Sequence, residues 1–114
     1  MKDKACSYLI AFTSPLPGKE VEYNNWYNNI HLKEVSALPG IISGRRFCMS
    51  KAQMGEPLHS HRYMVMYEVE SGREAEVLEG IRTAMPNMNI EPVVDLSDSP
   101  SFMVEAIGDA VVSG

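Results

Sequence analysis

The hydrophobic pattern of the chain switches between two periods. In four segments the apolar positions recur at every second residue, as in β-strands whose side chains point alternately to the two faces of a sheet. In two longer segments they recur every three to four residues, the spacing of one helix face. In chain order the pattern predicts a strand over 5–13, a helix over 20–38, strands over 41–50 and 62–70, a helix over 74–85 and a strand over 101–108.

This β-α-β-β-α-β order predicts an α+β fold of the ferredoxin-like kind. Right-handed crossovers place both helices on one face of a four-stranded antiparallel sheet, with the strands in the order 4-1-3-2. The first two strands then flank the third, so Cys6 and Cys48 lie about 9–10 Å apart, too far for a disulfide. The 114 residues predict one domain, 1–114, and the apolar segment 86–100 is expected to pack against it.

Every predicted strand carries apolar residues on both of its faces. A sheet that helices cover on one side only should have a polar outer face. Here the second face carries methionines instead, and the chain has no further elements to cover them: Met49, Met64, Met66 and Met103. We therefore expect a homodimer in which the two sheets face each other.

Charge and cysteine usage narrow the range of partners. The net charge is −5 and the ten basic residues are scattered, which argues against a nucleic-acid surface. No apolar run is long enough to cross a membrane. The two cysteines have neither metal nor redox spacing, which is typical of reduced thiols, so we expect a cytoplasmic protein.

The first helix carries the main candidates for chemistry. Tyr23, Trp26, Tyr27 and His31 follow one another at three- and four-residue spacings, on one side of a helix that bends near His31. A neutral imidazole at the edge of an apolar cavity can act as a general base. A structural histidine that bonds a backbone carbonyl and anchors the turn at Pro39 fits the same spacing, so both interpretations stay open.

Charged residues elsewhere give weaker signals. Arg46 lies on a strand that otherwise looks buried, where a charge is either paired or functional, so an ion pair and a substrate contact both remain open. Glu56, His59 and His61 share a polar loop without further ligands. We expect no metal site there. No phosphate-binding loop or nucleophile motif occurs, and no cofactor is expected.

The first helix and the strand after it resemble the dimeric α+β barrel superfamily, and within it the EthD-like proteins. Their common pattern is matched by Glu22, Tyr23, Asn24, Trp26, Tyr27, His31, Pro39, Gly40, Arg46 and Phe47, with Tyr67 and Glu68 similar to a family dipeptide. Two positions depart from it. Lys33 replaces a usual proline, and Asn28 and Asn29 replace residues that are often acidic.

The resemblance implies a small-molecule enzyme, because the superfamily includes monooxygenases, cyclases and decarboxylase-like members. We predict action on a hydrophobic or aromatic oxygenated compound in an apolar barrel pocket, with His31 as proton shuttle and Tyr27 orienting the substrate. The predicted ligand-binding residues are Trp26, Arg46, Met49, Met64, Met66, Tyr67 and Met103. A carrier or sensor that binds an aliphatic or aromatic ligand without chemistry is the alternative, and a barrel that is only dimer core is the third reading.

Overall fold

The computed structural model of the chain describes residues 6–56 and 61–114. Its strands are β1 (Cys6–Pro15), β2 (Ile41–Cys48), β3 (Tyr63–Glu70), β4 (Val94–Asp95) and β5 (Ser101–Glu105). Its helical segments are α1 (Glu20–Trp26), the π-helical turn η1 (Tyr27–His31), α2 (Leu32–Ser36), α3 (Glu74–Ala84) and the 3-10 turn η2 (Met85–Asn87). The predicted α+β order is confirmed, and β4 is a short strand that the pattern did not predict.

The sheet is antiparallel, and its strands follow the predicted order. β1 pairs with β3 on one side and with β5 on the other, and β2 pairs with the far edge of β3. β4 pairs with Ser14 and Pro15 at the end of β1, which holds the segment after α3 beside that strand. β1 and β2 therefore flank β3, and Cys6 and Cys48 form no disulfide.

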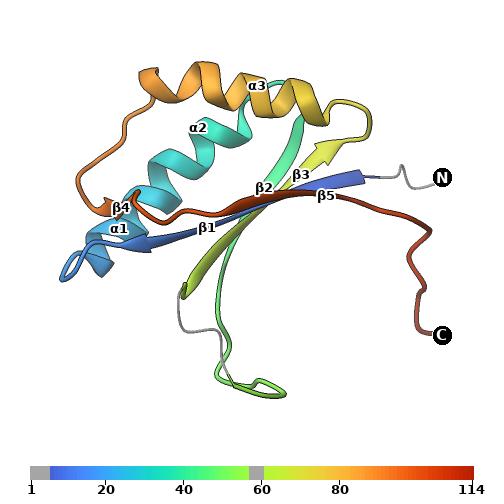
Figure 1. The fold of residues 1–114 in the computed structure, drawn as a ribbon, viewed down its shortest axis with the longest axis horizontal. Helices are drawn as coiled ribbons and strands as arrows, with labels where there is room; N and C mark the ends of the chain where they lie inside the picture. Colours follow the sequence, from blue (N-terminus) through green and yellow to red (C-terminus); the bar gives the residue numbers. More distant parts are fainter. Residues whose placement is uncertain (1–5, 57–60) are drawn as a thin grey trace.

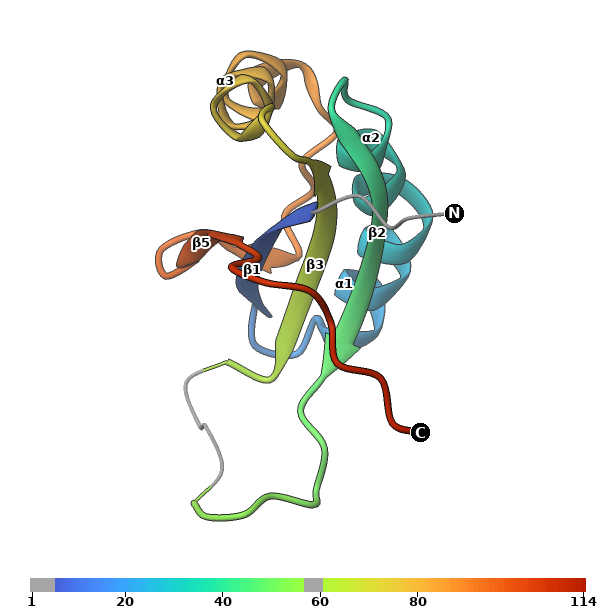
Figure 2. The same cartoon turned by 90° about the vertical axis from the view of Figure 1, so that its right-hand side faces the viewer.

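All helical segments lie on one side of the sheet (Figure 1). In the perpendicular view α1 and α2 lie in line with each other behind β2, and α3 lies apart from them (Figure 2). Among the residues that the structure describes, no helix has the length and apolar character to span a membrane. The core lies between the helices and the sheet, and its buried members are Leu9, Tyr23, Trp26, Tyr27, Val35, Val65, Tyr67, Val69, Val77, Val93 and Val94.

Two glycines let the helices approach β2 closely. A β-carbon on Gly44 would lie 2.8 Å from a ring carbon of Tyr67 and would collide with the Ser36 hydroxyl of α2. Gly40, just before β2, has φ near +91°, and a β-carbon there would lie 2.7 Å from Val77 of α3. Only glycine satisfies both the backbone angle at position 40 and the small space at the two positions.

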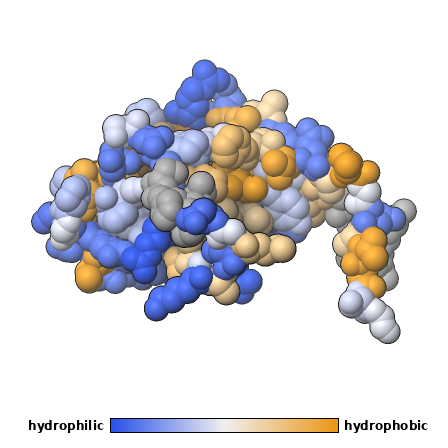
Figure 3. Space-filling view, turned by 60° about the horizontal axis from the view of Figure 1, so that its bottom comes forward, coloured by the Kyte–Doolittle hydropathy of each residue, from blue (hydrophilic) through white to orange (hydrophobic). Residues whose placement is uncertain are grey.

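The sheet face away from the helices, here called the outer face, is apolar and uncovered. Residues directly opposite each other on paired strands point to the same face. The β1–β3, β2–β3 and β1–β5 registers therefore place on it Ser43, Arg45 and Glu68 and a larger set of apolar side chains, which includes Tyr8, Ile10, Phe47, Met64, Met66, Phe102 and Val104. Phe47, Phe102 and Val104 are 40%, 53% and 41% exposed. Figure 3 shows hydrophobic residues crossing the middle of this side of the molecule.

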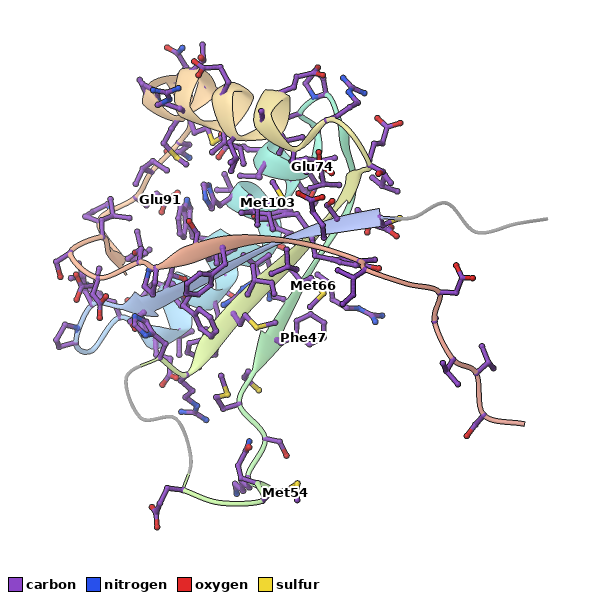
Figure 4. The ribbon with its side chains drawn as sticks, turned by 45° about the vertical axis from the view of Figure 1, so that its right-hand side comes forward. Phe47, Met54, Met66, Glu74, Glu91 and Met103 are labelled. Atoms are coloured by element: carbon purple, nitrogen blue, oxygen red, sulfur yellow. The ribbon has the colours of Figure 1, made fainter. Side chains whose placement is uncertain are left out.

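One methionine lies on the other side. The sequence predicted Met49, Met64, Met66 and Met103 on one face, but Met103 pairs with Leu9 of the core and packs on the helix side. Figure 4 shows Met66 and Phe47 on the far side of the sheet from Met103. The placement of Met103 on the outer face was therefore wrong, because its face depends on the register with β1.

Candidate functional site

A cavity of about 270 Å³ lies between the sheet and the helices. The sheet provides its floor, the first helical segments form one wall, and α3 with the segment after it closes the others. Its lining residues are Leu9, Ala11, Phe12, Thr13, Trp26, Tyr27, His31, Val35, Tyr67, Ile81, Met85, Ile90, Val94, Leu96, Ser99 and Ser101. The lining is mostly apolar, with a few hydroxyls and one imidazole, which is typical of a small-molecule pocket.

The first helix reaches this cavity through a π-helical turn. The backbone N–H of Leu32 bonds the carbonyl of Tyr27, a span of five residues in place of the usual four. The wider turn brings residues five apart onto the same face, so the rings of Trp26 and His31 stack with centroids 4.9 Å apart and planes 15° apart. The bend expected near His31 is this turn, and π-turns of this kind are frequent at functional sites.

His31 is buried and held on three sides. Its ring stacks on Trp26, meets the Tyr27 ring edge-on at 5.1 Å, and places Nδ1 3.6 Å from Oε1 of Glu34. Burial lowers the pKa of His31 below its ordinary value, and the Glu34 carboxylate offsets this only in part. Burial therefore favours the neutral imidazole. It bonds no backbone carbonyl among the described residues, so the anchoring role has no contact to support it.

Glu34 and the backbone of Asn89 are site components that sequence reasoning missed. The indole Nε1 of Trp26 donates to the Asn89 carbonyl at 2.7 Å, and the Asn89 N–H donates to Oε2 of Glu34 at 3.0 Å. The backbone of this one residue thus links the segment after α3 to the first helix. The three-residue spacing between His31 and Glu34 is the only sequence signal that could have paired them.

Two tyrosines bring hydroxyl groups to the cavity. Burial raises the pKa of Tyr27 to about 12. Burial, and then the neighbouring Tyr27, raise the pKa of Tyr67 further above its ordinary value. Both hydroxyls therefore stay protonated and can donate a hydrogen bond. The Tyr67 hydroxyl is enclosed and has no partner within the described part of the chain.

Arg46 lies behind the tyrosines and does not line the cavity. Its guanidinium carbon is 4.5 Å from the centroid of the Tyr27 ring, and its Nη atoms donate to Oδ1 of Asn24 and of Asn28, both at 2.9 Å. No carboxylate lies within ion-pair distance of it in the described residues, so the salt-bridge interpretation finds no partner within this chain. Asn28, one of the two departures from the family pattern, supplies an acceptor for this guanidinium.

The remaining candidate residues lie elsewhere. Met64 and Met66 belong to the outer face, Met49 follows the end of β2, and Met103 packs against the core without lining the cavity. His61 is buried, with Nε2 2.9 Å from the Asp98 carbonyl. His59 of the same loop lies outside the described residues.

Comparisons with solved structures agree with the fold. A haem-degrading protein of Mycobacterium tuberculosis, with two haems in its active site, is 17% identical over 92% of this chain and 99% of its own, with a TM-score of 0.58. An EthD family protein of Bacillus halodurans is 13% identical over 90% of this chain and 99% of its own, with a TM-score of 0.56.

A third similar structure is a monooxygenase of Streptomyces coelicolor in complex with nanaomycin D. It is 13% identical over 96% of this chain and 94% of its own, with a TM-score of 0.51. No protein-family model and no curated protein matches the sequence. At these identities the likeness shows the fold alone. It confirms that the chain has the ferredoxin-like α+β architecture that the EthD-like resemblance implied, and it leaves the activity to the residues of the site.

Proposed function

We propose that the cavity binds a small, uncharged hydrophobic or aromatic compound with an oxygen atom, and that His31 transfers a proton on it. The observation that carries this proposal is the buried imidazole that lines an apolar cavity. Burial lowers its pKa and so favours its neutral form. Its Nδ1 is enclosed against Glu34, which leaves Nε2 as the ring nitrogen that would meet a ligand. A base in that position abstracts a proton without first losing one of its own.

The lining also limits the class of ligand. No Lys, Arg, Asp or Glu of the described residues lines the cavity, so a charged group entering it would stay unpaired at a high cost. The Tyr27 hydroxyl, whose pKa burial raises to about 12, stays protonated and would donate to a carbonyl or phenolic oxygen of the ligand. These features support a neutral carbonyl compound or phenol of small size, in keeping with a cavity of about 270 Å³.

The proposed step is proton removal next to a polarised oxygen. Nε2 of His31 takes a proton from a carbon adjacent to a carbonyl, or from a phenolic hydroxyl, and becomes imidazolium. In this step the Tyr27 hydroxyl would donate to the oxygen on which negative charge develops, and Trp26 would provide an apolar surface. Arg46 acts by holding Tyr27 rather than by touching the ligand.

A carrier or sensor remains the second candidate. The cavity is apolar enough to hold a ligand without any reaction, and the fold houses a monooxygenase with nanaomycin D bound and a haem-degrading protein. In that case His31 and Tyr27 would only hold the polar end of the ligand. Loss of either contact would then weaken binding, and there would be no turnover to lose.

We also propose that two copies of the chain associate through their outer faces. The uncovered apolar side chains of β2, β3, β1 and β5 support this, because such a contiguous surface is unusual on a monomer. A ligand role for Met49, Met64 and Met66 requires a second copy to close a space over them, and it stays a prediction.

The test of the proton-transfer role uses His31→Ala and His31→Asn, with His61→Asn as the matched control at a buried histidine outside the cavity. Phenols, aromatic ketones and fatty acids are screened by the shift in melting temperature, and the ligands that stabilise the protein are then tested for turnover. We expect neutral aromatic compounds to stabilise the protein more than fatty acids, whose carboxylate finds no partner.

For a compound that is turned over, His31→Ala and His31→Asn should lower kcat by about 10²–10⁴-fold and change the affinity by less than about tenfold. An active His31→Asn variant would rule out proton transfer, because asparagine keeps a hydrogen bond but cannot carry a proton near neutral pH. Binding weakened by about 1–3 kcal/mol, without any turnover in the wild type, would favour the carrier.

A further inference from the structure

Glu34 and His31 form a buried pair whose facing atoms lack other partners. Oε1 of Glu34 and Nδ1 of His31 lie 3.6 Å apart, and both atoms are enclosed without a hydrogen bond among the described residues. An enclosed carboxylate oxygen and an enclosed ring nitrogen are costly to leave unsatisfied. A hydrogen atom between them removes both costs with a movement of a few tenths of an ångström.

The carboxylate is held in place from its other side. Oε2 of Glu34 accepts the Asn89 N–H at 3.0 Å, and the Asn89 carbonyl accepts the indole N–H of Trp26 at 2.7 Å. Trp26 in turn stacks on the His31 ring. These contacts form a closed loop of four residues in which neither the carboxylate nor the imidazole can turn away without breaking another contact.

We propose that Glu34 is the positioning residue of His31: it keeps the proton of the neutral imidazole on Nδ1 and leaves the lone pair of Nε2 facing the cavity. The meaning of this arrangement for catalysis rests on the proposed function, but the arrangement itself does not. In the opposite tautomer the Nδ1 lone pair would face the Glu34 oxygen, and two acceptors would meet with no hydrogen between them.

The arrangement also accounts for where the proton and the positive charge go during the proposed transfer. When Nε2 takes a proton from a ligand, the ring becomes an imidazolium, and its Nδ1–H already points at a carboxylate that stabilises the charge. When the proton returns to the product, the ring goes back to the same tautomer. No proton passes to Glu34, and no co-reactant is needed.

Nuclear magnetic resonance of the ligand-free full chain with ¹⁵N-labelled histidine tests the proposal, because the two ring nitrogens report the tautomer directly. We expect wild-type His31 to carry its proton on Nδ1. In Glu34→Gln the amide oxygen can still accept the Asn89 N–H, while the amide NH₂ donates to Nδ1 and shifts the ring to the Nε2–H tautomer. Glu22→Gln, an exposed carboxylate of the same helix paired with Lys19, is the control and should leave the wild-type tautomer unchanged.

The same titration gives a second readout. The Glu34 carboxylate opposes the lowering of the His31 pKa that burial causes, so Glu34→Gln should lower this pKa further and Glu22→Gln should not. A wild-type His31 with its proton on Nε2, or an unchanged tautomer in Glu34→Gln, would overturn the proposal. The wild-type spectrum decides the first point even if the variant does not fold.

The experiment is independent of the proposed enzyme activity. A wild type with the Nδ1–H tautomer and no turnover of any ligand would uphold the role of Glu34 and refute proton transfer. Turnover that His31→Asn abolishes, together with an Nε2–H tautomer, would refute the role of Glu34 and would mean that Nε2 acts as a proton donor instead of a base.

Discussion

The two faces of the sheet are built from the same strands and differ in almost every other respect. On the helix side Val65, Tyr67 and Val69 are almost fully buried, and polar groups are fixed by specific contacts. On the outer face Phe47 and Phe102 remain open to solvent beside the Ser43 and Glu68 side chains, which share a hydrogen bond. Helices of the same chain cover the helix side. The outer face carries many apolar side chains, and none of the described helices packs on it.

This difference separates two tasks that one strand carries out at once. Because successive residues point to opposite faces, β3 contributes Tyr67 to the cavity and Met66 to the outer face. A change at one position should therefore affect the cavity and a change at the next should affect association. The following predictions test that separation, from the largest expected effect to the smallest.

The largest effect is expected at the outer face. Met66→Lys should weaken association of two copies by more than about a hundredfold, because burying an unpaired lysine costs several kcal/mol. Met54→Lys is the matched control, since Met54 is fully exposed on the loop after β2 (Figure 4). Analytical ultracentrifugation measures both. A wild type that stays monomeric at micromolar concentration would contradict the proposed dimer.

A valine-to-alanine change should lower the free energy of unfolding by different amounts on the two faces. Val65→Ala removes methyl groups from a residue that is 2% exposed and should lower the free energy of unfolding by about 2 kcal/mol. Val104→Ala, at 41% exposure, should lower it by less than about 0.5 kcal/mol. Urea unfolding in a Met66→Lys background keeps association out of the comparison. Equal losses would mean that the outer face is covered within one chain.

Removing a tyrosine hydroxyl should have opposite effects at two positions of the helix side. Tyr67→Phe deletes an enclosed, unpartnered group and should raise the free energy of unfolding by about 1 kcal/mol. Tyr23→Phe deletes a hydroxyl that bonds Thr13 and should lower it by about the same amount. If Tyr67 holds a ligand, the stabilised variant should also bind phenols more weakly. A destabilised Tyr67→Phe would show that the hydroxyl has a partner.

The smallest effect concerns pH. Burial puts the pKa of His31 in the folded state below its unfolded value near 6.5, so the unfolded chain binds the proton first. The contribution of His31 to stability is therefore fully present above the unfolded pKa and decreases as the pH falls toward the folded pKa. Thermal unfolding of the wild type and His31→Asn across this range should show the two curves converging at low pH. Parallel curves would mean that the imidazole is not desolvated.

Much of the fold followed from the sequence because it depends on local periodicity. The period of two marked β1, β2, β3 and β5, the helical period marked the first helix and α3, and right-handed connections then allowed few arrangements. The short β4 was missed, since two paired residues leave no periodic signal. The grouping of Trp26, Tyr27 and His31 on one side of a helix was also predictable.

The exact site was not predictable from spacing. The spacings predicted Trp26 and His31 on one broad side of the helix, but the direct stacking of their rings depends on a π-turn. Such a turn differs from a regular helix by a single hydrogen-bond span, which composition does not reveal. Glu34 is three residues from His31, yet its orientation depends on Asn89, which is 55 residues further along the chain. Contacts at that separation form only when the segment after α3 packs onto the first helix.

The sequence by itself determined the order of the elements, the aromatic face of the first helix and the presence of apolar residues on both sides of the sheet. Only the tertiary structure decided which side each strand residue faces. Alternation sorts the residues of one strand into two sets, but the pairing register with a neighbour assigns those sets to the helix side or the outer face. Met103 shows this: its pairing with Leu9, rather than its own pattern, places it beneath the helices.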